Sequence, residues 1–260
     1  MIDCYLEIAI KAVQTSGHIL VDYFQKVHDF RQKNKNIRDL VTEVDILSEK
    51  NIKSKIEDVF PKHTIIAEET KTEKHGSDVI WHIDPLDGTV NYSQGIPLCA
   101  VSVGVEKKGE IVAGAIYNPF LEEIYYASKS QGAYLNGKLI HVSKKKTLEE
   151  GIYVAAFSAV SSSAKKREYE IFGKINDTTR GVLRIGSAAL ALAYLACGKI
   201  DGFWSKDLFS WDLAAGIILV EESGGKISSA EGKKYKFKDS VLVASNKIIH
   251  ENLLNVLKGL

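Results

Sequence analysis

The sequence has few cysteines, no excess of either charge and no long apolar run, and each shortage excludes a class of protein. Its three cysteines, Cys4, Cys99 and Cys197, lie far apart and form no CxxC pair, so we expect neither a disulfide framework nor a thiolate zinc site. Lysine and arginine number 34 against 33 aspartates and glutamates, which leaves no overall field to hold a polyanion. The longest apolar run, Ala188 to Cys197, is about half as long as a membrane span. These shortages favour a cytoplasmic protein with a small-molecule partner, and with neither nucleic acid nor membrane.

The order of hydrophobic patterns in the 260 residues predicts a mixed α/β protein. Apolar residues recur at three- and four-residue steps from Leu6 to Phe24, which predicts an amphipathic helix. A second helix is expected from Ile46 to Val59. Short strand patterns then follow one another, several joined by hairpin-length turns such as Asn136-Gly137. We therefore expect an N-terminal lobe, residues 1–145, with two helices on a largely antiparallel sheet.

The second half of the chain has a different pattern. Shorter strands alternate with helices, among them an alanine-rich helix from Ser187 to Cys197 and a helix from Leu213 to Glu222. Alternation of this kind predicts an α/β lobe, which we place at residues 146–260.

Five acidic residues occupy positions where carboxylates converge in enzymes. The sequence IDPLDGT places Asp84 and Asp87 three residues apart directly after a predicted strand. Glu68 and Glu69 close the preceding strand, and Asp212 begins a predicted helix. Each feature alone has an ordinary reading, as a turn, a surface pair or a helix N-cap. Together they supply hard oxygen ligands that suit Mg²⁺, and two such ions roughly 4 Å apart are a recurrent device for phosphoryl transfer.

Four motifs carry a resemblance to a known family. They are DLVTEVD at Asp39 to Asp45, AEE at Ala67 to Glu69, WHIDPLDGTVNYS at Trp81 to Ser93 and WDLAAGIILVEESGG at Trp211 to Gly225. In this order the motifs resemble the inositol monophosphatase family of Mg²⁺-dependent, lithium-sensitive phosphatases, whose relatives include fructose-1,6-bisphosphatases and 3′(2′),5′-bisphosphate nucleotidases. The resemblance implies an α/β (α+β) fold, a layered αβαβα sandwich of the sugar-phosphatase type, and commonly a homodimer.

The resemblance also implies a metal-ligand set. Glu68, Asp84 and the backbone carbonyl of Leu86 would hold a first Mg²⁺, and Asp84, Asp87 and Asp212 would hold a second. Asp84 would bridge the two ions. The expected cofactor is two or three Mg²⁺ per subunit.

Three residues are assigned to catalysis by the same resemblance. Asp45 and Thr89 would orient and deprotonate the attacking water, and Glu69 would tune the site. The backbone N–H groups of Gly88 and Thr89 would cradle the phosphate at the start of a helix. We therefore expect a phosphomonoesterase in which a metal-activated water attacks in line.

The leaving-group pocket departs from the family pattern. Members that prefer inositol phosphates have a glutamate seven residues before the Asp of the WD motif, and this chain has Ser205 there. Lys206 is a candidate to bind a second phosphate. Gly186, Ser187 and Ala188 match a segment that contacts the alcohol. Inositol-1-phosphate is the default substrate, with fructose-1,6-bisphosphatase, dual inositol/fructose phosphatase or bisphosphate nucleotidase activity as alternatives.

Other features remain open at this point. Arg184 is expected to be structural and His82 an ordinary strand residue. Residues 31–38, which include Lys33 and Lys35, could form a lid, a loop for a third ion or a solvated connection. A regulatory binding protein that kept the fold is the remaining alternative class, because some family members act through partner proteins.

Overall fold

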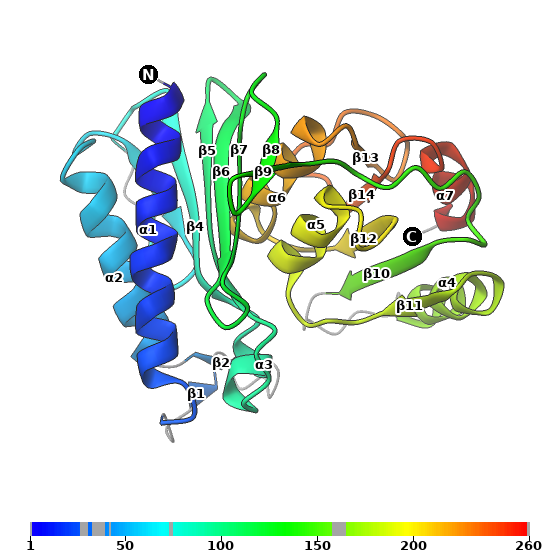
Figure 1. Ribbon diagram of the computed structural model, residues 1–260, viewed down its shortest axis with the longest axis horizontal. Helices are drawn as coiled ribbons and strands as arrows, with labels where there is room; N and C mark the ends of the chain where they lie inside the picture. The colour runs from blue at the N-terminus through cyan, green and yellow to red at the C-terminus, as the bar shows by residue number, and fades with distance from the viewer. Residues whose placement is uncertain are drawn as a thin grey trace.

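The described part of the chain forms a sandwich of five layers. The computed structural model describes residues 2–26, 31–32, 40–41, 43–72, 75–157 and 165–258. In these ranges a helix pair, a seven-stranded sheet, a second helix pair, a five-stranded sheet and a third helix pair follow one another (Figure 1). The expected αβαβα sandwich is confirmed. Lys33, Lys35, Asp39 and Thr42 lie outside the described residues.

The first two layers come from the N-terminal half. Helices α1 (Ile2–Tyr23) and α2 (Glu43–Glu57) cover one face of a sheet with the order β3-β4-β5-β6-β7-β8-β9. Its strands are β3 (Thr64–Ala67), β4 (Val79–Asp87), β5 (Ala100–Lys107), β6 (Glu110–Asn118), β7 (Glu123–Ser128), β8 (Ala133–Leu135) and β9 (Lys138–Ile140). All neighbouring strands in it are antiparallel except β3 and β4, as predicted. The short elements β1 (Arg31–Gln32), β2 (Leu40–Val41) and α3 (Thr89–Ser93) lie beside this sheet.

The other three layers come from the C-terminal half. Helices α5 (Ala188–Ala196) and α6 (Ser210–Glu222) lie between the sheets, and α4 (Lys165–Thr178) and α7 (His250–Leu257) cover the outer face. The second sheet has the order β11-β10-β12-β14-β13. Its strands are β10 (Ile152–Phe157), β11 (Gly181–Leu183), β12 (Gly202–Lys206), β13 (Lys226–Ser229) and β14 (Val241–Ser245). Helix α4 was not predicted, because its charged sequence buries only a narrow apolar stripe around Ile171 and Ile175.

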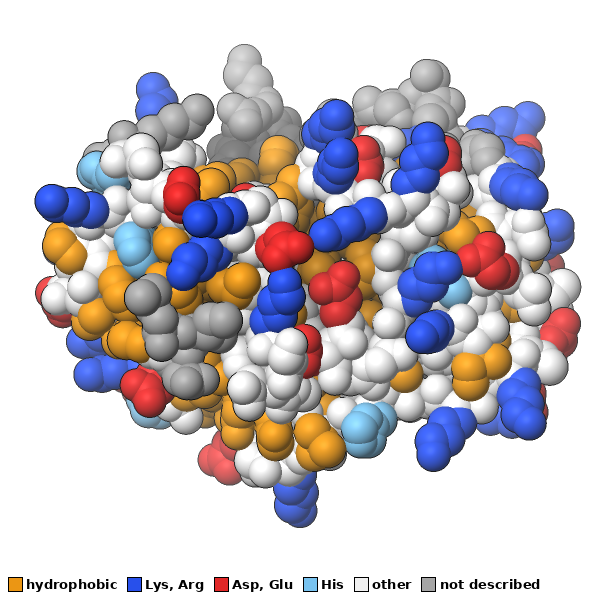
Figure 2. Space-filling view, turned by 90° about the horizontal axis from the view of Figure 1, so that it is seen from above, with side chains coloured by type: hydrophobic (Ala, Val, Ile, Leu, Met, Phe, Trp, Pro, Cys, Tyr) orange, Lys and Arg blue, Asp and Glu red, His pale blue; other side chains and the backbone are white. Residues whose placement is uncertain are grey.

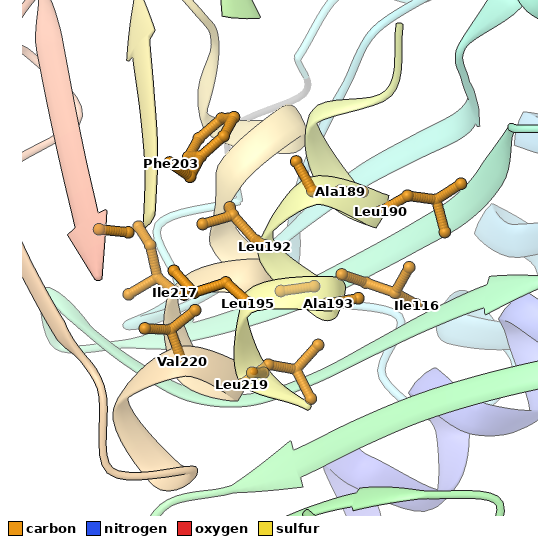
Figure 3. Close-up of a cluster of buried hydrophobic side chains, with 14 of the residues drawn as sticks. Ile116, Ala189, Leu190, Leu192, Ala193, Leu195, Phe203, Ile217, Leu219 and Val220 are labelled. Atoms are coloured by element: carbon orange, nitrogen blue, oxygen red, sulfur yellow. The ribbon is translucent and has the colours of Figure 1, made fainter. Parts of the chain in front are cut away.

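The central helix pair explains the longest apolar run in the sequence. A helix that is apolar on all sides is stable only where protein surrounds it, and α5 lies between both sheets. Figure 3 shows its side chains packed against α6, β6 and β12. The labelled contacts come from Leu190, Leu192 and Leu195 of α5, Ile217, Leu219 and Val220 of α6, Ile116 of β6 and Phe203 of β12. None of the helices in the described ranges combines the length and apolar character that crossing a bilayer requires.

Two glycines set how closely α6 approaches the first sheet. Gly104 of β5 and Gly114 of β6 are directly paired. A Cβ atom at Gly104 would lie 2.5 Å from the Cβ of Ala214 and 2.8 Å from the backbone nitrogen of Ala215. A Cβ atom at Gly114 would lie 2.8 Å from the Cα of Ala215. The absence of side chains here therefore allows the first turns of α6 to lie directly on β5 and β6.

A buried histidine in the outer layer predicts acid sensitivity. His250 is fully buried, and its ring nitrogens lie 2.8 Å from the hydroxyls of Ser228 and Ser245. Burial, with a smaller contribution from Lys226, lowers its pKa from 6.5 to about 4. Between pH 6.5 and pH 4, His250 therefore binds a proton in the unfolded chain but not in the folded chain. This contribution to stability is complete above pH 6.5 and falls by about 3 kcal/mol as the pH drops through 4.

Urea unfolding between pH 7.5 and pH 4 measures this effect. We expect His250→Asn to have a flatter pH profile than the wild type. His18→Asn, at an exposed position of α1, should keep the wild-type slope. Equal slopes for the wild type and His250→Asn would contradict the assignment.

Candidate active site

A bulge at the end of β4 places the two aspartates of the DPLD sequence. These residues were expected directly after the strand, but β4 continues to Asp87. Asp84 pairs with Ser102 and Asp87 with Ala100, so three steps on β4 face two steps on β5. Residues three apart in a regular strand point to opposite faces. The extra residue removes this alternation, which allows both carboxylates to point to the same region.

Three predicted carboxylates lie close enough to act on a fourth, Asp84, whose exposed fraction is only 1%. Burial raises its pKa well above the ordinary value, and the negative charges of Glu68, Asp87 and Asp212 raise it further. The backbone N–H of Leu86 donates to Asp84 Oδ1 at 3.0 Å and acts in the opposite direction. Residues that directly follow β3 or belong to β4 and α6, far apart in the sequence, therefore share one electrostatic environment.

Asp87 joins this cluster to the central helix α5. Its carboxylate accepts hydrogen bonds from the Ser187 hydroxyl at 2.5 Å, the Ala189 N–H at 2.7 Å and the Ala188 N–H at 3.3 Å. Burial raises the pKa of Asp87 to about 6 even though these donors favour the charged form. The Ser187 hydroxyl also caps α5 by accepting from the Leu190 N–H. One side chain thus fixes both the helix start and the carboxylate.

The predicted pair of Asp45 and Thr89 is also brought together. The Thr89 hydroxyl lies 3.4 Å from Asp45 Oδ1 and 3.0 Å from the carbonyl oxygen of Leu86. Asp45 is fully buried on α2. Gly88, which precedes α3, has a φ of +94°, and a Cβ atom there would lie 2.9 Å from the Leu98 carbonyl oxygen. Only glycine fits this turn without strain.

Glu69 is positioned by a residue that the sequence reasoning missed. Its backbone N–H donates to Oε2 of the buried Glu49 at 2.8 Å, and the Thr70 hydroxyl donates to Oε1 at 2.5 Å. Lys53 pairs with the same carboxylate at 3.1 Å. Helix α2 therefore holds the segment that carries Glu68 and Glu69.

A second missed residue, His82, links the strand and the helix that supply the aspartates. Its exposed fraction is 2%. Nδ1 lies 2.9 Å from the Ser210 hydroxyl at the start of α6, and Nε2 lies 3.0 Å from Glu106 Oε2. Asp212, two residues after Ser210, accepts a hydrogen bond from the Phe209 N–H at 2.7 Å. The signal in the sequence was the two-residue strand period, which places His82 on the same face as Asp84.

A cavity of about 380 Å³ lies beside the carboxylates. Its described lining is Asp87, Val90, Asn91, Val154–Phe157, Arg184, Gly186–Ala188, Leu208 and Asp212. The segment expected to contact the alcohol, residues 186–188, therefore lies in this lining. This volume falls within the range of small-molecule sites.

Ser205 and Lys206 are not part of this described lining. Ser205 is buried on β12, and the Lys206 ammonium lies 3.0 Å from Glu168 Oε1 on α4. Successive strand residues point to opposite faces, so Lys206 is directed toward the outer helices together with Trp204. The cation expected near a second phosphate is thus paired elsewhere.

Gly186, in the cavity lining, has a backbone conformation and a close neighbour that an alanine would not tolerate. It has a φ of +78°, and a Cβ atom there would lie 2.7 Å from Nδ2 of Asn91. Asn91 donates to the carbonyl oxygens of Ile185 and Leu98, both at 2.7 Å. We expect Gly186→Ala to lower the free energy of unfolding by about 1–3 kcal/mol and to raise KM.

Urea unfolding and steady-state kinetics test this prediction. Gly224→Ala is the matched control, since Gly224 has a φ of +90° but no atom within 4 Å of an added Cβ. The control should lose stability from backbone strain alone and keep its KM. The same KM increase in both variants would contradict a role for the Asn91 contact.

A larger cavity of about 520 Å³ lies near the other end of α6. Its lining includes Glu110 and Lys129, which pair at 2.6 Å, and Glu222, which accepts from the backbone of residues 130 and 132. Three of its charged groups are thus already bound by neighbouring groups of the protein. The smaller cavity is the better candidate site because two of the predicted aspartates, Asp87 and Asp212, line it.

The acidic cluster fits a hard divalent cation by its donors. It offers carboxylate oxygens with no thiolate, the donor type of Mg²⁺ rather than of zinc or copper. The mutual repulsion around Asp84 is what a bound cation would relieve. Within the described ranges, no three His, Cys, Asp or Glu side chains stand in a ready-made ligand arrangement. Asp87 and Asp212 are instead oriented by the N–H and hydroxyl donors given above.

The fold and the site together define a class of protein. Two sheets that enclose a helix pair, with buried carboxylates beside a sugar-sized cavity, are the features of a sugar-phosphatase sandwich. The chain belongs to the inositol monophosphatase family, which it matches over residues 1–259. It is therefore a phosphoric monoester hydrolase of a family that is generally metal-dependent.

Individual relatives match over nearly the full chain. A fructose-1,6-bisphosphatase/inositol-1-monophosphatase of Aquifex aeolicus is 36% identical over 254 residues, covering 98% of this chain and 95% of the relative. The Nus factor SuhB of Pseudomonas aeruginosa is 33% identical over 258 residues, covering 97% and 95%. Among solved structures, the extragenic suppressor protein SuhB of Bartonella henselae has a TM-score of 0.93 at 33% identity, covering 98% of this chain and 99% of that one. An inositol monophosphatase of Anabaena has a TM-score of 0.87 at 34% identity, covering 98% and 95%.

Proposed function

We propose that this phosphatase is Mg²⁺-dependent and hydrolyses the phosphomonoester of a small polyol or sugar, with inositol-1-phosphate as the default substrate. The observation that carries the proposal is the convergence of Glu68, Asp87 and Asp212 on the buried Asp84 beside a cavity of about 380 Å³. The names of two relatives, inositol-1-monophosphatase and fructose-1,6-bisphosphatase/inositol-1-monophosphatase, support this substrate class.

The metal ligands follow from the cluster. Glu68, Asp84 and the Leu86 carbonyl oxygen would hold one Mg²⁺, and Asp84, Asp87 and Asp212 a second; the number of ions is two or three. When bound, such ions acidify water and neutralise charge on the phosphate and on the leaving oxygen. The chain's own contribution is orientation, because Ser187 and the first N–H groups of α5 fix the Asp87 carboxylate.

Asp45 and Thr89 would orient the attacking water and accept its proton. The Thr89 hydroxyl, within reach of both Asp45 and the Leu86 carbonyl, orients a water molecule, and Asp45 accepts the proton that the water loses. Glu69 adjusts the charge of the site. The N–H groups of Gly88 and Thr89 bind the phosphate where the tight turn meets α3.

The two halves of the chain would supply different parts of the active site. Residues 1–145 supply most of the metal ligands, and residues 146–260 supply Asp212 and the leaving-group pocket with Gly186, Ser187 and Ala188. We propose no substrate contact for Lys206, which is paired with Glu168 on the other side of the second sheet, and we place Ser205, buried on β12, at the edge of this pocket.

We further propose a cytoplasmic homodimer that is sensitive to lithium. The three cysteines are free thiols, as a reducing compartment requires. Basic and acidic side chains are interspersed on the face seen in Figure 2, which supports a small-molecule substrate over a nucleic acid.

Phosphate release tests the function. Purified protein is assayed with Mg²⁺ on inositol-1-phosphate, fructose-1,6-bisphosphate, other sugar phosphates and adenosine 3′,5′-bisphosphate, with Asp87→Asn as the blank. Activity on inositol-1-phosphate that disappears with EDTA is the expected result. Strong preference for the nucleotide would establish the nucleotidase alternative. Mg²⁺ binding without turnover of any substrate would favour a regulatory binding protein, which the relationship to Nus factor SuhB makes the second candidate.

A further inference from the structure

One positively charged side chain belongs to the described lining of the cavity beside the carboxylates. Among the described lining residues, Arg184 is the single lysine or arginine. It is exposed and follows directly after β11. Sequence reasoning treated it as structural, because an isolated arginine in a loop carries no signal of its own.

The charge of Arg184 is available to a ligand. Its guanidinium carbon lies 5.4 Å from the centre of the Phe157 ring, so an aromatic face supports the group while its N–H donors remain accessible. No carboxylate among the described residues forms an ion pair with it. Lys206 differs in this respect, since Glu168 neutralises it on the far side of the second sheet.

Hydrogen bonds on the C-terminal side of Arg184 fix the backbone there relative to Asp87. The neighbouring Ile185 carbonyl accepts from Asn91 at 2.7 Å, and Ser187 donates to Asp87 at 2.5 Å. Positions 184 and 187 are three residues apart, so their Cα atoms are separated by at most about 11 Å. A hexose-sized substrate bound at Asp87 is therefore long enough to reach the region around Arg184 in the same cavity.

We propose that Arg184 is a specificity-determining residue that binds a second phosphate on the leaving group, so that the site favours sugar bisphosphates. This inference rests on the proposed function and narrows its substrate class. The planar guanidinium matches the oxygens of a phosphate through two parallel hydrogen bonds. It would supply the cation that the sequence suggested at Lys206.

The experiment compares two substrates that differ by one remote phosphate. The values of kcat/KM for fructose-1,6-bisphosphate and fructose-1-phosphate are measured for the wild type, Arg184→Ala, Arg184→Lys and Arg180→Ala. We expect the bisphosphate to monophosphate ratio to fall about tenfold or more in Arg184→Ala. The ratio for Arg184→Lys should be intermediate, because lysine keeps the positive charge but cannot form the two parallel hydrogen bonds of a guanidinium. Arg180, at an exposed position before β11 and outside the described lining, should leave the ratio unchanged.

Calorimetric titration with fructose-1,6-bisphosphate separates the two proposals. If the wild type releases phosphate from fructose-1-phosphate but Arg184→Ala keeps the wild-type ratio, Arg184 has no role in specificity and the inference is wrong. If the wild type releases phosphate from neither sugar, the proposed function fails for these substrates. Weaker bisphosphate binding by Arg184→Ala than by Arg180→Ala would then still support the Arg184 site, and equal binding would overturn it.

Discussion

Asp87→Asn should abolish phosphate release while the protein remains folded. The substitution keeps the shape of the side chain but removes the negative charge that a Mg²⁺ ion would bind. Loss of a residue that merely orients a metal ligand costs about 10–100-fold in metal affinity or activity. Loss of the ligand's own charge should therefore lower kcat on the order of a thousandfold or more.

Stability should move in the opposite direction. Burial and the charge of Glu68 raise the pKa of Asp87 to about 6, so the ionised form is unfavourable in the metal-free fold. We expect a Tm for metal-free Asp87→Asn equal to or above that of the wild type. Ser187→Ala is the graded control, because it removes one hydrogen-bond donor to Asp87 and keeps the carboxylate. Its activity should lie between those of the wild type and Asp87→Asn. Wild-type activity in Asp87→Asn would contradict the assignment of the site.

Gly104→Ala should be strongly destabilising although it adds a single methyl group. The new Cβ would lie 2.5 Å from Ala214 and 2.8 Å from the backbone of Ala215, so the whole helix must shift. Overpacking of this kind costs about 1–3 kcal/mol, and contact with backbone places the expected loss at the upper end. Because α6 also carries Asp212, kcat should fall together with stability.

Urea unfolding and kinetics with saturating Mg²⁺ measure both effects. Gly173→Ala, on α4, is the matched control, since an added Cβ there meets no atom within 4 Å. It should be neutral or should gain up to about 1 kcal/mol from helix propensity. A Gly104→Ala variant as stable as Gly173→Ala would show that the helix has room to move.

The fold was largely predictable because its signals are local. The Asn136-Gly137 turn, the hairpin between β5 and β6 and the apolar run of α5 each follow from neighbouring residues, and all are present. Helix α4 was missed because its amphipathic stripe is short. The bulge that aligns Asp84 and Asp87 depends on pairing with β5, which no pattern within β4 reveals.

The site was predictable to the extent that its residues share motifs. Glu68, Asp84, Asp87 and Asp212 were expected together, and their charges do act on one another. Arg184 and His82 were missed because their significance comes from what the fold places beside them. The side of β12 to which Lys206 points follows from strand alternation once Trp204 is buried against the outer helices, and Glu168 on α4 pairs with it there.

Ser187 limits how this enzyme can diverge. Its hydroxyl donates to Asp87 and accepts from the first turn of α5, and the residue also lines the cavity beside the carboxylates. A substitution at Ser187 selected for a new leaving group would at the same time loosen the Asp87 carboxylate and uncap the buried helix α5. New substrates are therefore more accessible through the exposed rim of the cavity, to which Arg184 and Val90 belong, than through its floor.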